Sequence, residues 1–316
     1  MSAVNVIDGP PPESPTATPV RSRLSLLFAV VAGSMAVFFG NYVFFVRTTL
    51  GQELDNAALV GAEHETQGVI TEAWDLLDII SVASLALACV VIGMVALLRK
   101  RVALAFAALT TIAVANVATQ LLKRVALERP DLIGAGDVNS LPSGHATVAT
   151  TVAVGLVMVT APRWRSVVAL VTVVFPIGVA VAVVTASWHR PSDSIASFCV
   201  VLGIAAASLA AVVAVFGFDA GERPPRWVRR SALAFASAAI VILSAVSLVG
   251  LWAVRNRLRD GQLDARWETV AYTASTAGIA AGALAVMLCL VLALRGVAVG
   301  HGGWNRTAEG ATAVDH

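Results

Sequence analysis

The sequence predicts an all-α protein, a polytopic membrane helical bundle with about eight transmembrane helices. Of the 316 residues, 58% are hydrophobic and only 13% are charged, whereas a soluble globular domain has about 45–50% and about 25%. So few charges cannot cover the surface of a soluble domain, and so apolar a chain is not expected to be disordered. The net charge of +2 is too small to indicate a nucleic-acid partner.

Long apolar runs provide the second observation, because a helix needs about 20 apolar residues to cross a bilayer. Eight segments meet this requirement approximately: 24–45, 76–98, 103–122, 145–160, 167–188, 193–216, 231–254 and 269–294. The fourth segment is the shortest, and it begins beside Gly144 and His145, which suggests a helix end that is buried in protein rather than lipid. Trp252 and Trp267 lie near the ends of the last two segments and suit an aromatic belt.

These segments define the predicted domains. A six-helix core covers 24–216, a linker covers 217–230, and an additional two-helix hairpin covers 231–295. The Pro-rich residues 1–23 are predicted to be a disordered tail without a signal peptide, and 296–316 a second tail. The three cysteines lie singly in separate apolar runs, so we predict no disulfide, no metal site and no cofactor.

The distribution of basic residues predicts which side of the membrane each loop faces. With eight spans, both tails share one side, and the 22 basic residues divide 13 to 9 in favour of that side. The tails are therefore expected in the cytoplasm. The acidic stretch 46–75 is expected to be an outer loop, with Asp78 following as an interfacial carboxylate. The Ala-, Val- and Arg-rich, Lys-poor composition suggests a bacterial plasma membrane.

Three polar stretches fall on the outer side, and the helix count alone brings them to one face. They are Lys123–Pro130 after the third span, Ser140–His145 before the fourth, and Trp188–Asp193 before the sixth. An interfacial histidine is usually structural and a Lys-Arg pair at a helix end is usually an anchor. Their clustering on one face favours a functional site instead.

The residue types in these stretches predict an anion site with a reactive histidine. Lys123 and Arg129 supply charge-assisted donors. Ser143 and Gly144 precede a helix whose free N–H groups bind anions. His189 and Asp193 are four residues apart, so a carboxylate can orient the imidazole from the next helical turn. Together these residues indicate phosphoryl transfer through a histidine.

The stretches resemble the type 2 phosphatidic acid phosphatase (PAP2) superfamily, membrane lipid phosphatases related to vanadium haloperoxidases. Pro142-Ser143-Gly144-His145 matches the family motif completely, and Arg129-Pro130 and the His189…Asp193 spacing match in the expected order. The resemblance covers roughly residues 24–216 and implies a six-helix core.

By this resemblance the protein is a phosphatase of a lipid phosphate, such as polyprenyl diphosphate, phosphatidic acid or phosphatidylglycerol phosphate. His189 is then the nucleophile, Asp193 orients it, and His145 protonates the leaving group. Phosphate oxygens are bound by Lys123, Arg129, Ser143 and the Gly144 N–H, with no metal. Membrane lipids are the other expected partners, and the sequence does not define an oligomeric state.

Two departures from the family pattern are visible. Five residues separate Lys123 from Arg129 where the family usually has six, and the Ser-Arg of the third motif is replaced by Ala182 and Val183. A cation from elsewhere is therefore expected to substitute for the missing arginine. The candidates are Arg190, Arg124, Arg255, Arg257, Arg259 and Arg266.

Other functions remain open from the sequence. A weak or inactive enzyme would explain the missing arginine. A head-group or phosphoryl transferase would use the same residues with another acceptor than water. A non-catalytic anion- or lipid-binding protein or transporter would need neither His189 nor Asp193.

Overall fold

The computed structural model describes residues 20–135, 139–217 and 225–295, and every regular element within these ranges is helical. The predicted fold class is confirmed. The tails 1–19 and 296–316 and the linker residues 218–224 lie outside the described residues. The elements are α1 (Val20–Asn41), η1 (Tyr42–Val46), α2 (Thr49–Glu63), α3 (Gln67–Asp78), α4 (Val82–Leu98), α5 (Val102–Leu121), η2 (Leu122–Ala126), α6 (Gly144–Val159), α7 (Arg165–Thr172), α8 (Val174–Thr185), α9 (Pro191–Phe216), α10 (Arg226–Arg259) and α11 (Ala265–Ala293).

Within the described residues, six helices are long and apolar enough to cross a membrane, or seven if one bent pair counts as a single span, which is fewer than the eight spans predicted. The six are Val20–Val46, Val102–Ala126, Arg165–Thr185, Pro191–Phe216, Arg226–Arg259 and Ala265–Ala293. The remaining apolar helix, α6, has 16 residues. It is too short to qualify, so the structure does not support the expected fourth span 145–160.

The stretch 46–75 was expected to be an outer loop without regular structure. This prediction is wrong, because the stretch is mostly helical. It forms α2 and most of α3, and α3 meets α4 at an angle of 60°. The expected span 76–98 is therefore broken at residues 79–81. Ser81 causes the break, because its side chain caps α4 and forms a capping box with Ser84. The acidic residues of this stretch alternate with apolar ones at helical spacing, which a count of charges does not detect.

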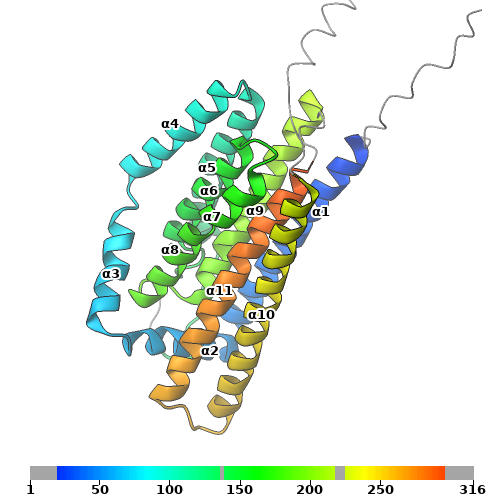
Figure 1. Ribbon diagram of the computed structural model, residues 1–316. Coiled ribbons are helices and arrows are strands. Elements are labelled where there is room, and N and C mark those ends of the chain that lie inside the picture. Colours follow the sequence, from blue (N-terminus) through cyan, green and yellow to red (C-terminus); the bar gives the residue numbers. More distant parts are fainter. Residues whose placement is uncertain (1–19, 136–138, 218–224, 296–316) are drawn as a thin grey trace, which may run out of the picture.

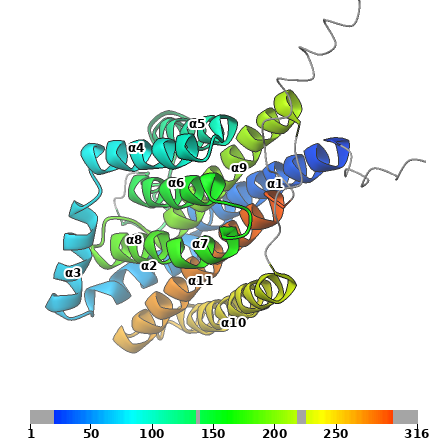
Figure 2. The same cartoon turned by 45° about the horizontal axis from the view of Figure 1, so that its top comes forward.

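The helices form one bundle whose long members run in a common direction, with α2 lying across one end (Figures 1 and 2). The turn between α10 and α11 lies at this same end in Figure 1. Small residues allow the hairpin to close tightly. A Cβ on Gly250 would lie 2.6 Å from the Ala274 Cβ, and one on Gly278 would lie 2.7 Å from the Ser247 Oγ.

The hairpin is attached to the rest of the bundle at both ends of α11. At one end, the buried Arg165 donates through Nη1 to the Leu294 carbonyl at 2.8 Å. At the other end, the Tyr272 hydroxyl lies 2.8 Å from Thr185 Oγ1 in α8, and Glu268 lies 2.8 Å from His64, which follows α2. The hairpin is therefore an integral part of the fold.

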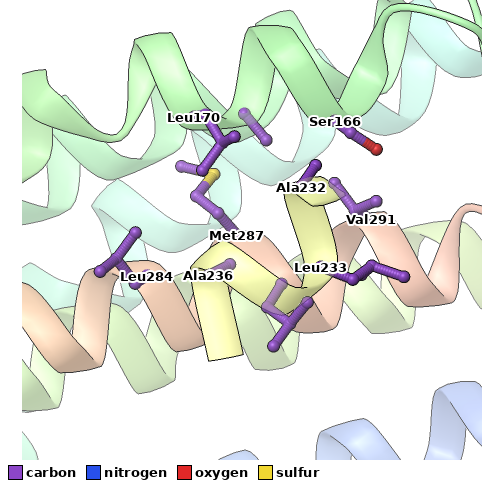
Figure 3. A pocket seen from close by; sticks show the side chains of 10 residues that line it. Ser166, Leu170, Ala232, Leu233, Ala236, Leu284, Met287 and Val291 are labelled. Atoms are coloured by element: carbon purple, nitrogen blue, oxygen red, sulfur yellow. The ribbon is translucent and has the colours of Figure 1, made fainter. Parts of the chain in front are cut away.

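A small void lies between α7, α10 and α11, lined by Leu170, Ala236 and Met287 among others (Figure 3). Its volume is about 20 Å³ and its lining is almost entirely apolar. A water needs polar partners as well as space, so this void is a packing gap. It lies near the start of α7, at the opposite end of α6 from Gly144.

Candidate active site

The three polar stretches meet at the end of the bundle where α2 lies. The Ser143 N–H donates to the Asp193 carbonyl at 3.1 Å, and Ser197 Oγ donates to the Ser143 carbonyl at 2.7 Å. These bonds fix the start of α6 against the first turns of α9. Asn139 Nδ2 donates to the Lys123 carbonyl at 3.0 Å, which attaches the end of α5 to the same place.

His189 and Asp193 form a hydrogen-bonded pair within this end of the bundle. His189 Nδ1 lies 3.0 Å from Asp193 Oδ2; His189 precedes the N-cap Arg190, and Asp193 lies in the first turn of α9, which begins at Pro191. The same oxygen accepts from Ser140 Oγ at 2.6 Å and from the Arg190 N–H at 3.1 Å. With a proton on Nδ1, the lone pair of the imidazole is on Nε2, the atom that can act as a nucleophile.

His145 lies beside this pair at the start of α6. It is within electrostatic range of both His189 and Lys123. Its ring is 5.4 Å from the ring of Trp188, which in turn is 6.0 Å from Trp74 of α3. The indole of Trp188 therefore forms a wall next to the two histidines.

The start of α6 is built as an anion site. A cis Leu141–Pro142 peptide leads into Ser143, which is fully buried and caps the helix by accepting from the Ala146 N–H. A Cβ on Gly144 would meet only Gln120 Nε2, at 3.5 Å. The first N–H groups of α6 carry the positive end of the helix dipole toward the histidines.

Two buried arginines complete the charged lining. The Arg129 side chain is 2% exposed, and its Nη2 lies 3.7 Å from the Asp55 carboxylate. Neither Nη1 nor Nη2 of Arg129 has a hydrogen-bond partner within the described residues. Arg190 is also buried. Burial and the nearby Arg129 lower the pKa of Arg190, so Arg190 lies close to Arg129 with both side chains withdrawn from water.

The family model described as PAP2 superfamily matches residues 102–217. This segment belongs to the PAP2 superfamily. Among curated proteins and among solved structures, none matches the chain. The PAP2 match covers α5 to α9, so α1 to α4 and the hairpin lie outside it.

The third PAP2 motif normally contains an arginine, which this chain replaces with Val183. An arginine side chain would not fit at this position. Val183 is fully buried and packs with Ala149, Leu77 and other apolar residues of α3, α6 and α8. Its carbonyl accepts from the N–H groups of Trp188 and His189. A guanidinium there would be surrounded by apolar side chains, so the motif position serves packing in this protein.

The proposed substitutes differ in where the structure places them. Arg190 lies among Arg129, Asp55 and Asp193, whose charges act on it. Arg124 is exposed. In the hairpin, Arg257 lies 4.8 Å from the Trp267 ring centroid and donates to Gln262; Arg259 and Arg266 are exposed and Arg255 half-buried. Arg190 is the candidate that directly follows His189 in the sequence and interacts with Asp193.

Several residues that the sequence analysis does not identify hold the three polar stretches in place. The Tyr42 hydroxyl donates to the Glu128 carbonyl at 2.8 Å, and Asn41 Nδ2 donates to the Ser192 carbonyl at 3.0 Å. Gln52 and Asp55 approach from α2. No motif marks these residues, because they act through pairings with distant segments. Among the described residues, no three His, Cys, Asp or Glu side chains gather as a set that could hold a metal ion.

Proposed function

We propose that the protein is a membrane lipid-phosphate phosphatase that acts through a phosphohistidine. The observation that carries the proposal is the His189–Asp193 pair, with Nδ1 3.0 Å from the carboxylate and the buried side chains of Arg129 and Arg190 nearby. A carboxylate that fixes Nδ1 leaves Nε2 free to attack phosphorus. The family supports phosphoester chemistry in general, and the lipid substrate and the intermediate are proposed here.

In the proposed first step, His189 Nε2 attacks the phosphorus and the bond to the lipid oxygen breaks. His145 donates its proton to that leaving oxygen. Lys123, Arg129, Arg190, Ser143 and the Gly144 N–H stabilise the charge on the phosphoryl oxygens. In the second step His145 takes a proton from water, which attacks phosphorus and breaks the P–N bond. Inorganic phosphate leaves and the enzyme returns to its starting state.

An apolar groove next to the site supports a substrate with a hydrocarbon chain. It has a volume of about 290 Å³ and lies between α1, α5 and α9, with Ser34 and Gly203 toward the middle of the bundle. Phe38, Leu122 and Cys199 line its other end. Leu122 directly precedes Lys123, so a chain lying in the groove would bring its phosphate toward Lys123. We propose that the site faces the outside of the plasma membrane.

Two rivals share the fold. A transferase would pass the phosphoryl or head group to an acceptor other than water, and a binding or transport protein would hold the anion without reaction. The transferase is favoured over hydrolysis only if the phosphoryl or head group is recovered on an added acceptor and inorganic phosphate is not released. The binding protein would retain its function without His189.

The test is phosphate release from three lipids in detergent micelles: phosphatidic acid, phosphatidylglycerol phosphate and a polyprenyl diphosphate. His189→Ala is expected to lower the rate by about 10³-fold or more. His64→Gln is the matched control, because His64 lies at the α2–α11 contact and its replacement should leave the rate within about two-fold. Activity that survives His189→Ala, or release from none of the lipids, would refute the proposed mechanism.

A further inference from the structure

The helix α2 lies outside the PAP2 match, yet its buried polar face points to the site. Thr48 caps the helix by accepting from the Gly51 N–H at 3.0 Å. Gly51 is required there, because a Cβ at this position would lie 1.9 Å from the Phe44 carbonyl oxygen. The chain can therefore turn back sharply after η1, and α2 packs beneath α9 and α11. Figure 1 shows α2 crossing this end of the bundle.

Gln52 on this face holds the segment that follows Arg129. Its Nε2 donates to the Pro130 carbonyl at 2.6 Å and to the Val46 carbonyl at 2.8 Å, and its Oε1 accepts from the Leu132 N–H at 3.2 Å. All three hydrogen bonds are made by one buried amide. The backbone on the C-terminal side of Arg129 is thus fixed relative to α2.

Asp55 lies one helical turn after Gln52 and holds the Arg129 side chain itself. The carboxylate is fully buried within the protein and accepts from the Ser192 N–H at 3.2 Å and from the Ser192 hydroxyl. Its Oδ2 lies 3.7 Å from Arg129 Nη2. This distance allows attraction without a hydrogen bond, so the donors of Arg129 remain available to another anion.

Two buried donors without a partner are costly in a folded protein, and they indicate that a ligand completes the site. Arg129, Arg190 and Lys123 bring three positive charges to this region, and Asp193 is already hydrogen-bonded to His189. Asp55 is the second carboxylate there. It can hold a guanidinium in place from the side away from the phosphate.

We propose that Asp55 is a positioning residue for phosphate binding, which acts by holding the Arg129 guanidinium toward the anion. This inference rests on the proposed function, because it takes the ligand of Arg129 to be a phosphate. It extends the site to α2, a helix that the PAP2 match does not include. Without Asp55, the guanidinium keeps its charge but loses its fixed orientation, and the anion must order the side chain when it binds.

Binding of inorganic phosphate tests the inference independently of turnover. The Kd is measured by isothermal titration calorimetry on the full chain in nanodiscs, for Asp55→Asn, Arg129→Gln and the double variant. Each single change is expected to weaken binding about ten-fold, and the double variant to be no weaker than Arg129→Gln alone, because both changes remove one interaction. Glu63→Gln, an exposed carboxylate on the same helix, is expected to change the Kd by less than about two-fold.

Ser192→Ala distinguishes the two contacts of Asp55, with Ser192 and with Arg129. It keeps the test decisive if Asp55→Asn does not fold. It removes the hydroxyl but leaves the carboxylate and Arg129, so the Kd should stay within about two-fold. The inference is overturned if Ser192→Ala weakens binding as much as Arg129→Gln does, if Asp55→Asn has no effect, or if the effects of the pair add. Intact phosphate binding with this pattern, but without lipid hydrolysis, would uphold the role of Asp55 and refute the phosphatase.

Discussion

Ionisation of Asp55 should cost stability at neutral pH. Burial, followed by the nearby charge of Asp193, raises the pKa of Asp55 from 3.8 to about 6. The hydrogen bonds from Ser192 and the charge of Arg129 lower the pKa of Asp55, and the charge of Arg190 also interacts with Asp55. The folded protein therefore holds the proton more tightly than the unfolded chain. The protonated carboxyl therefore contributes to the free energy of unfolding. This contribution is fully present below pH 3.8 and is lost as the pH rises through about 6.

The size of the effect follows from the shift. A difference of 6 − 3.8, about 2 pKa units, at 1.36 kcal/mol each corresponds to about 3 kcal/mol. Asp55→Asn has the same volume and does not titrate. The stability of the variant relative to the unsubstituted protein should therefore rise by up to about 3 kcal/mol between pH 4 and pH 7.

Thermal unfolding followed by tryptophan fluorescence in detergent measures this difference at intervals between pH 4 and pH 8. Subtracting the free energy of unfolding of one protein from that of the other cancels the contributions of groups that titrate alike in both. The arginines stay charged throughout this range. Glu63→Gln, which removes an exposed carboxylate from the same helix, serves as the control. A flat difference for Asp55→Asn would show that the carboxylate is not desolvated. The opposite slope would show that attraction to Arg129 outweighs burial.

Three further outcomes are expected from substitutions around the site. Arg190→Gln should lower kcat/KM for a lipid phosphate by about 100-fold or more, whereas Arg124→Gln should stay within about three-fold, because Arg190 is buried beside the site and Arg124 is exposed. Ser140→Ala removes the 2.6 Å bond to Asp193 and should lower kcat about ten-fold with little change in KM, as stopped-time phosphate assays would show. Gly203→Leu fills the apolar groove and should lower kcat/KM for long-chain phosphatidic acid about ten-fold more than for a dibutyryl analogue. Equal effects on the two arginines, an unchanged Ser140→Ala, or equal losses for both chain lengths would each contradict the corresponding assignment.

The sequence was sufficient for the parts of this protein that depend on local pattern. Apolar runs predicted the helical membrane bundle, and helix counting alone brought Lys123, His145 and His189 to one end of the bundle. The spacing of His189 and Asp193 predicted their contact, although His189 lies just before α9 and only Asp193 is in its first turn.

The parts that were missed depend on contacts between distant segments. Residues 46–75 contain many acidic side chains, and Asp55 resembles the others in the sequence although it is fully buried. Its burial follows from the docking of α2 under α9 and α11, which no local pattern encodes. The break before α4 was also missed, because the apolar run continues through residues 79–81 and only the Ser81 cap interrupts the helix.

The attachment of α2 has a consequence for exchanging parts between related enzymes. The PAP2 segment accounts for residues 102–217, but Gln52 and Asp55 precede it and Glu268 and Tyr272 follow it. A graft of this segment into another scaffold would carry both histidines and yet leave the Pro130 and Ser192 ends unsupported. Functional chimaeras should therefore require the junction to lie before α2, with α11 taken from the same parent.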